Sequence, residues 1–332
     1  MNSVKFLYLS QADVIKAGLT LGGAVPLIEE SFRAHGCGEF ENPPKPGIHP
    51  LPDAFIHAMP GYLPGQGVAG VKWISSFSSN HHHQVPTVMG LIVLNDVDTG
   101  APRAVMEGGW ITAVRTAAVS AVAAKNLARA DAGVIGLVGA GVQGYVHTLA
   151  MREVLPRLDM LKVFDVNREQ VDRYLTKMAP HASFRLERAD SAQAAIETAD
   201  VIITATGRLN RPIFHKEWIR EGALVLPVHT RGWDKDIPYK MDKFVVDYWE
   251  QFSRVQGQPG AYYESLLDPD AQLGEIVAGK KPGRESERER IISHNYGMAI
   301  HDMAIAREIF TRATAKGLGT VLPLMEETPI FV

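Results

Sequence analysis

The sequence predicts an α/β protein that combines a Rossmann-type, doubly wound parallel sheet with a second, α+β domain. Three observations support this fold class: a glycine-rich turn lies between a buried strand and a helix, strands and helices alternate after it, and several consecutive strands come before it. Alternating strands and helices are typical of a parallel sheet covered on both faces. Consecutive strands separated by turns indicate an antiparallel or mixed sheet in a separate domain.

A glycine-rich turn, GAGVQG, follows the apolar run 134–138 and precedes a helical pattern. Its first glycine permits a tight turn, its second lets the backbone approach a pyrophosphate, and its third lets the helix pack closely. The N–H groups and the positive dipole end of the helix favour phosphate. The residues expected to bind the cofactor here are Gly139, Gly141, Val142, Gln143 and Gly144.

An acidic residue ends the next predicted strand, MLKVFD. Asp165 lies 21 residues after Gly144, where a carboxylate can accept hydrogen bonds from the ribose hydroxyls and repel a 2′-phosphate. This position favours NAD over NADP. Arg168, just beyond the acid, is the residue that could instead accept a 2′-phosphate.

The composition excludes several classes of protein. With 332 residues, 46% of them hydrophobic and 21% charged, the chain is long enough for two domains. A formal net charge of −3 with dispersed basic residues argues against a nucleic-acid partner. The single cysteine, Cys37, allows no internal disulfide and fits a reducing compartment. We see no signal peptide and no run of about 18 apolar residues, so we expect a cytoplasmic protein without a membrane partner.

The N-terminal part of the chain predicts strands with helices at either side. A short strand precedes Ser10, the expected N-cap of a helix that reaches about Gly36 with an interruption near residues 18–23. A long alanine-rich helix, GGWITAVRTAAVSAVAAKNLA, then leads into the second domain, and the end of the last helix is expected to fold back onto the first. The strands expected between these helices lie in AFIHAM, VAGVKWISSF, TVMGLIVLN and PRAVMEG.

Two basic residues lie in apolar surroundings. Arg115 is in the first half of the alanine-rich helix, where a buried guanidinium is costly without an anionic partner. Lys72 lies in a predicted strand whose alternation puts Val71 and Trp73 on one face and the lysine on the other. The pattern alone favours an ordinary outward lysine.

Several stretches that together cover most of the chain resemble the ornithine cyclodeaminase and μ-crystallin family. The most diagnostic is ITAVRTAAVSAVAAK, followed at a short distance by GAGVQG. The others are AMPGYLPGQGVAGVKW, LIVLNDVDTGAPRAVMEG, LGEIVAGKKPGR and YGMAIHDMA. The resemblance implies a homodimer formed through the sheet of the first domain. We expect a substrate-binding and dimerisation domain at residues 1–118 plus 313–332, and the NAD-binding domain at 119–312.

Members of this family use NAD(P) to remove or add hydride at the α-carbon of an amino acid, through an imine. The resemblance places Lys72 in the active site as a catalytic residue, and it makes the substrate carboxylate the partner of Arg115. Lys45 stands where many relatives carry an arginine that also grips the carboxylate, so the charge is kept without the bidentate fork. Thr87 lies near a substrate-contacting position.

The acid–base aspartate of the family follows the fifth strand of the nucleotide domain. This chain has LPVHTRGWDKDIPYKMD there, and counting back eight residues from Asp242 matches Asp234 to the catalytic position, with Asp236 as the alternative. The bulky and charged residues of this segment suggest a substrate other than ornithine. Arg231 could meet an acidic side chain of that substrate.

Further residues are expected near the cofactor or are excluded as ligands. Three adjacent histidines at 81–83 invite a metal site, but neighbours on an extended segment point to alternate faces, so we expect no metal. Residues 204–206 follow a strand at the carboxyl edge of the sheet, where loops line the cofactor crevice. The remaining cofactor candidates are Thr116, Thr204, Ala205, Thr206 and His294, the last of which matches a family segment near the nicotinamide.

The expected function is that of an NAD-dependent oxidoreductase acting at the α-carbon C–N bond of an L-amino acid, as an amino-acid dehydrogenase or imine reductase. A redox-neutral ornithine cyclodeaminase, which forms proline and ammonia, is the first alternative. A non-catalytic, μ-crystallin-like NAD(P)-dependent ligand-binding protein is the alternative from another class. Asp165 argues against the last, because that branch favours a 2′-phosphate.

Overall fold

The computed structural model divides the chain into two compact units, and each contains one sheet. Unit 1 comprises Met1–Ala34, Gly38–Arg115 and Met298–Val332, and unit 2 comprises His35–Cys37 and Thr116–Gly297. The two units are described separately below. The residues that the structure describes are 3–207, 209, 211–229, 231–257, 261–263 and 267–325.

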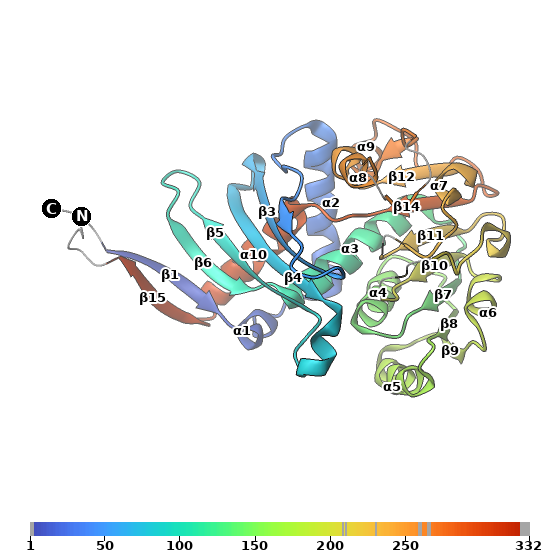
Figure 1. Ribbon diagram of the computed structural model, residues 1–332. Coiled ribbons are helices and arrows are strands. Elements are labelled where there is room, and N and C mark those ends of the chain that lie inside the picture. Colours follow the sequence, from blue (N-terminus) through green and yellow to red (C-terminus); the bar gives the residue numbers. More distant parts are fainter. Residues whose placement is uncertain are drawn as a thin grey trace. The chain divides into compact units, whose positions relative to one another are not determined.

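Unit 1 contains a mixed seven-stranded sheet in the order β15-β1-β6-β5-β4-β3-β2 (Figure 1). Strand β1 pairs in parallel with β6 and antiparallel with β15, and the other neighbouring pairs are antiparallel. The prediction of a mixed sheet before the glycine-rich turn is therefore confirmed. The strands are β1 (Val4–Leu9), β2 (Gly47–Ile48), β3 (Ala54–Leu63), β4 (Val68–Phe77), β5 (Val88–Asn95), β6 (Pro102–Glu107) and β15 (Thr320–Met325).

Helices α1 (Gln11–Lys16) and α2 (Leu21–Cys37) follow β1. Ser10 caps α1 as predicted: its hydroxyl accepts a hydrogen bond from the Asp13 N–H, and the Asp13 carboxylate accepts one from the Ser10 N–H. Both helices, together with the break between them, agree with the sequence pattern.

Helix α10 (Ala299–Ala315) packs on β3, β4 and β5 (Figure 1). A Cβ atom at Gly61 would lie 3.0 Å from the Cβ of Ala299, and one at Gly70 would lie 3.0 Å from the Met303 Sδ. The two glycines thus let an apolar helix lie close to the sheet. Because of this packing all of α10 belongs to unit 1, whereas the expected domain boundary at residues 312 and 313 assigns most of it to the cofactor domain.

Unit 2 contains an eight-stranded sheet in the order β13-β12-β14-β11-β10-β7-β8-β9, with all neighbours parallel (Figure 1). This arrangement confirms the doubly wound α/β prediction. Successive strands run outward from β7 to β9, and β10 then returns to the other side of β7, so the order reverses at β7 and β10. The strands are β7 (Val134–Val138), β8 (Met160–Phe164), β9 (Arg185–Arg188), β10 (Val201–Thr204), β11 (Leu224–Pro227), β12 (Lys243–Val246), β13 (Ala271–Gln272) and β14 (Ile291–His294).

The helices of unit 2 connect these parallel strands. Helix α3 (Gly109–Leu127) continues into this unit from residue 116 on. Within the described residues, no helix is both long and apolar enough to cross a membrane. The other helices are α4 (Val142–Arg152), α5 (Arg168–Met178), α6 (Ala192–Ile196), α7 (Ile237–Lys240), α8 (Trp249–Gln256) and α9 (Leu273–Val277).

Candidate active site

Lys72 and Arg115, the basic residues singled out in the sequence, meet at a single carboxylate in unit 1. The Nζ of Lys72 lies 2.7 Å from the Oδ1 of Asp302, and the Nε of Arg115 lies 3.2 Å from the same oxygen. All three side chains are buried. Strand β4 supplies the lysine, α3 the arginine and α10 the aspartate.

Lys72 lies on the inner face of the sheet. Its side chain is fully buried, whereas its neighbour Trp73 is 50% exposed. The two residues lie on opposite faces, as the alternation predicts, but the outward lysine that the pattern alone favours is wrong. Burial, together with the positive charges of Arg115 and Lys45, lowers the pKa of Lys72 to about 7, and Asp302 opposes this shift. A lysine with this pKa can both hold and release a proton near neutral pH.

Asp302 was not among the residues expected in the site. Its Oδ2 is buried and has no hydrogen-bond partner among the described residues, which leaves a strong acceptor beside Lys72 and Arg115. A buried, unsatisfied polar atom is uncommon in folded proteins. The signal for it was an acid in the apolar stretch MAIHDMAIA, the same kind of signal that pointed to Arg115.

The two other candidates of unit 1, Lys45 and Thr87, differ in their relation to this cluster. Lys45 acts electrostatically on Lys72 and on His57, so it belongs to the same charged surroundings. Thr87 precedes β5 and is exposed, whereas Lys72 pairs with Ile92 further along that strand. The structure does not bring Thr87 to the cluster.

The glycine-rich turn in unit 2 has the geometry that a dinucleotide requires. A Cβ atom at Gly139 would lie 2.5 Å from the Ala205 carbonyl oxygen, and one at Gly144 would lie 2.1 Å from the Gly139 carbonyl oxygen. At Gly141, the N-cap of α4, a Cβ atom would meet nothing within 4 Å, and Val142 is 71% exposed. The open N-terminus of α4 therefore fits a pyrophosphate at the point where the strand order reverses.

Asp165 holds this turn from the end of β8. Its Oδ2 accepts a hydrogen bond from the Ala140 N–H at 2.9 Å, and its Oδ1 accepts one from the Asn167 N–H at 2.9 Å. Gln170, which the sequence did not single out, donates to the Ala140 carbonyl at 2.8 Å. Asp165, the acid expected to bind the ribose, thus also supports the glycine-rich turn.

The remaining cofactor candidates lie at or near the carboxyl ends of the strands, apart from Thr116 in α3. Thr204 is fully buried, and its hydroxyl accepts a hydrogen bond from the Trp233 indole at 3.1 Å. Ala205 approaches Gly139, and the Thr206 hydroxyl bonds to the next carbonyl. Burial lowers the pKa of His294 to about 3, and its Nε2 lies 2.5 Å from the Tyr263 hydroxyl.

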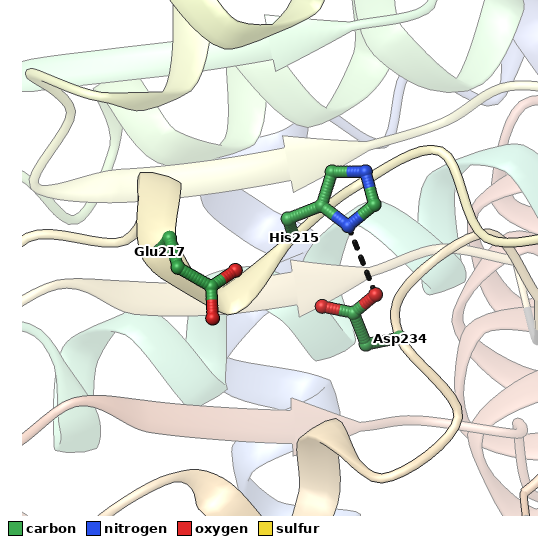
Figure 2. A group of neighbouring side chains, drawn as sticks. All are labelled: His215, Glu217 and Asp234. Atoms are coloured by element: carbon green, nitrogen blue, oxygen red, sulfur yellow. Dashed lines mark hydrogen bonds and ion pairs between the residues drawn. The ribbon is translucent and has the colours of Figure 1, made fainter.

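Asp234 is tied to the segment that precedes β11. Its Oδ1 lies 2.9 Å from the Nδ1 of His215, and its Oδ2 accepts a hydrogen bond from the Lys216 N–H at 3.1 Å. Figure 2 shows the His215 ring directed at this carboxylate, with Glu217 nearby. These residues line a cavity of about 410 Å³, together with Pro212, Lys235, Asp236 and Lys240.

His215, Glu217 and Asp234 are close enough to share a cation, since their ligand atoms lie within 4.8 Å of one another. The hydrogen bonds of Asp234 to the imidazole and to the backbone already account for this arrangement. Lys235 and Lys240 line the same cavity and add positive charge, so we assign no metal here. Arg231 lies with its guanidinium carbon 5.8 Å from the centre of the Tyr262 ring.

Comparisons with known proteins agree with this geometry. The model of the ornithine cyclodeaminase/mu-crystallin family matches residues 6–317. The nodulation efficiency protein NfeD of Rhizobium meliloti is 42% identical over 315 residues, which cover 95% of this chain and 98% of that protein. The structure of Thermococcus litoralis Δ1-pyrroline-2-carboxylate reductase with NADH and L-proline has a TM-score of 0.85 at 32% identity, over 95% of this chain and 99% of its own. An archaeal alanine dehydrogenase dimer with bound NAD has a TM-score of 0.85 at 30% identity, over 97% and 100%.

Proposed function

The chain belongs to the ornithine cyclodeaminase/mu-crystallin family, and on this premise we propose that it is an NAD-dependent oxidoreductase acting at the α-carbon C–N bond of an L-amino acid through an imine. The observation that carries the proposal is the buried Lys72–Asp302–Arg115 cluster. Such a cluster combines a carboxylate-binding cation, a proton carrier and an acceptor for an N–H group. A reaction at the α-carbon of an amino acid needs these three groups.

The roles proposed for the unit 1 residues follow from their contacts. Arg115 binds the substrate carboxylate, assisted by the positive charge of Lys45. Lys72, with its pKa near 7, exchanges a proton with the amino or imino nitrogen or with attacking water. The free Oδ2 of Asp302 accepts a hydrogen bond from the same nitrogen, while its Oδ1 keeps Lys72 and Arg115 in place.

The residues proposed to hold the cofactor are those of the turn 139–144 and the strand ends around it. The open N-terminus of α4 binds the pyrophosphate, and the Asp165 carboxylate favours an unphosphorylated ribose, hence NAD. Bound NAD supplies the acceptor or donor of hydride. Thr116, Thr206 and His294 remain proposed cofactor neighbours.

Asp234 remains the proposed acid–base residue of unit 2, with Asp236 as the alternative. Its hydrogen bond with His215 means that the two side chains act as a pair, since a change in one alters the proton affinity of the other. Arg231 and Thr87 remain proposed substrate contacts. Variants of Asp234 are therefore needed to separate proton transfer from support of the loop.

We also propose that the protein is a homodimer formed through the outer face of the unit 1 sheet, and that it functions in the cytoplasm. Apolar side chains project from that face: Trp73 is 50% exposed and Leu91 is 44% exposed, and they are directly paired across β4 and β5. A contiguous exposed apolar patch marks an interaction site. The dimeric alanine dehydrogenase of the same fold supports this assignment.

The test of the proposed function follows NADH fluorescence with a panel of L-amino acids plus NAD, and of 2-oxo acids plus ammonia plus NADH. We expect a net change in NADH with at least one member. Conversion of ornithine to proline and ammonia without net NADH would assign the cyclodeaminase reaction. Tight NADH binding without turnover of any member would assign a binding protein and overturn the proposal.

A further inference from the structure

The carboxylate of Asp234 is held at both of its oxygens by two consecutive residues of the segment that precedes β11. The Nδ1 of His215 lies 2.9 Å from its Oδ1, and the Lys216 N–H donates to its Oδ2 at 3.1 Å. The backbone supports these contacts, because the Asp234 N–H donates to the Phe214 carbonyl at 3.1 Å. The carboxylate therefore has one defined orientation in the cavity that Asp234 and His215 line.

The imidazole of His215 is fixed as well. Its ring lies edge-on to the ring of Trp218, with ring centres 5.0 Å apart and an angle of 86° between the planes. An ionised carboxylate only accepts hydrogen bonds, so the contact with Asp234 assigns the ring hydrogen to Nδ1. Figure 2 shows the other ring nitrogen facing away from Asp234. His215 thus acts on this carboxylate through a single donor atom.

Asp236, the alternative acid–base residue, has a different partner. It forms an ion pair with Lys240, four residues further along the chain. The hydrogen bond with Asp236 raises the pKa of Lys240, so this lysine stays charged and compensates the Asp236 carboxylate. Among the described residues, Asp234 is the one of the two acids that has a histidine partner.

We propose that His215 is a positioning residue of the reaction, which holds Asp234, and not Asp236, as the carboxylate that exchanges a proton with the substrate. This inference rests on the proposed function and adds a residue to its acid–base group. The proton moves from the ammonium group of the amino acid to Asp234, and Nδ1 of His215 keeps its hydrogen. Each carboxylate oxygen can accept more than one hydrogen bond, so the two that already hold Asp234 leave room for the substrate.

This role predicts which kinetic constant depends on His215. A base must lie within hydrogen-bond reach of the proton that it takes, and a carboxylate that is already oriented needs no further ordering when the substrate arrives. His215 itself does not bind the substrate. Its loss should therefore lower kcat and leave KM unchanged.

The first experiment compares three changes of His215 in the full-length protein, with NAD and the L-amino acid of the panel that is turned over fastest. His215→Asn keeps an amide donor near the place of Nδ1, whereas His215→Gln moves the amide further out and His215→Leu removes the donor. We expect kcat to fall at least about tenfold in the last two variants and to stay within about threefold of the wild type in the first. His181→Leu, a change of an exposed histidine of unit 2, is the matched control and should alter neither constant.

Melting temperatures identify any of these variants that does not fold. If His215→Leu is one of them, the comparison of His215→Asn with His215→Gln decides, because both keep a polar side chain.

Double variants identify the carboxylate through which His215 acts. If it acts through Asp234, adding His215→Leu to Asp234→Asn should lower kcat by less than about twofold, because residues that act as a unit are not additive. Adding it to Asp236→Asn should cost the full factor. The reverse result would overturn the assignment to Asp234.

NMR spectroscopy provides a measurement that does not need turnover. Nitrogen spectra of the NADH-loaded wild type should show the ring hydrogen of His215 at Nδ1, and Asp234→Ala should lose this signal, because the partner sets the tautomer. A ring hydrogen at Nε2 in the wild type, or a wild-type kcat in both His215→Gln and His215→Leu, would overturn the inference while the proposed reaction stands. Absence of turnover with every amino acid would instead reject the proposed function and the role of His215 with it, and an Nδ1 signal would then belong to a purely structural hydrogen bond.

Discussion

Lys72 donates a hydrogen bond from its Nζ to the Oδ1 of Asp302 at 2.7 Å, and both side chains are completely buried. Arg115 donates to the same oxygen at 3.2 Å. One carboxylate thus compensates two cations that β4 and α3 bring together. Removing one member of a buried ionic group is costly, because the charge left behind has lost its partner.

Asp302→Asn tests this relationship through stability. We expect the free energy of unfolding to fall by about 3–5 kcal/mol, because two buried cations lose their counter-charge. Urea unfolding monitored by circular dichroism measures it. The control is Asp159→Asn, which removes a surface ion pair with Arg185 in which both side chains are 68% exposed, and it should cost less than about 1 kcal/mol. Equal losses in the two variants would show that Asp302 does not compensate the cluster.

The pKa of Lys72 predicts how stability changes with pH. That pKa falls from 10.5 to about 7 in the folded chain, first through burial and then through Arg115. Between these values the unfolded chain binds more protons than the folded one, so the contribution of Lys72 makes the free energy of unfolding rise with pH. The free energy of unfolding of the wild type minus that of Lys72→Met should therefore become more positive from pH 7 to pH 10. A difference that stays constant over this range would contradict the lowered pKa.

The sequence identified those site residues whose charge conflicts with the apolar residues around them. Arg115 in an alanine-rich helix needed an anionic partner, and the resemblance assigned the substrate carboxylate to it. The structure adds Asp302, nearly two hundred positions further along the chain, as a partner of its Nε. Sequence spacing cannot reveal such a pairing, because it depends on α10 packing against the sheet of unit 1.

Most strands of the two sheets were predictable, whereas β14 and β15 were not. The pattern around the glycine-rich turn gave β7, α4 and β8 correctly. Strand β14 has only two apolar residues, Ile291 and Ile292, and β15 contains Pro323, so neither has the apolar run or the alternation that identifies a strand. Their positions are set by pairing: β14 lies between β11 and β12, and β15 pairs with β1.

Asp165→Ala tests the acid at the end of β8. The change removes both the carboxylate proposed for the ribose and the hydrogen bond to the Ala140 N–H. We expect the Kd for NADH to rise at least about tenfold, and the preference for NADH over NADPH to shrink, because charge-assisted hydrogen bonds and repulsion of a 2′-phosphate are both lost. NADH and NADPH fluorescence titrations measure this. Glu169→Gln, a change of an exposed neighbour in α5, serves as control and should alter neither Kd.

Asp234→Asn separates proton transfer from support of its loop. If Asp234 is the acid–base group, kcat/KM falls by at least about 100-fold, while the melting temperature and NADH binding stay close to those of the wild type. Asp236→Asn should leave turnover near the wild-type value. A lower melting temperature with turnover retained would instead assign Asp234 to the hydrogen bonds with His215 and the Lys216 N–H. Loss of activity in Asp236→Asn alone would move the acid–base role by two residues.

Trp73→Glu tests the proposed dimer. Trp73 is paired with Leu91 on the outer face of the sheet, and Met89, which is 38% exposed and lies two residues before Leu91, extends the apolar surface along β5. A charge in the middle of such an interface is not compensated by the second copy, which presents the same charge in an isologous contact. We expect light scattering after size exclusion to give the mass of a dimer for the wild type and of a monomer for the variant. Val166→Glu, a change of an apolar residue of unit 2 that is 91% exposed, should keep the wild-type mass, and a dimeric Trp73→Glu would place the interface elsewhere.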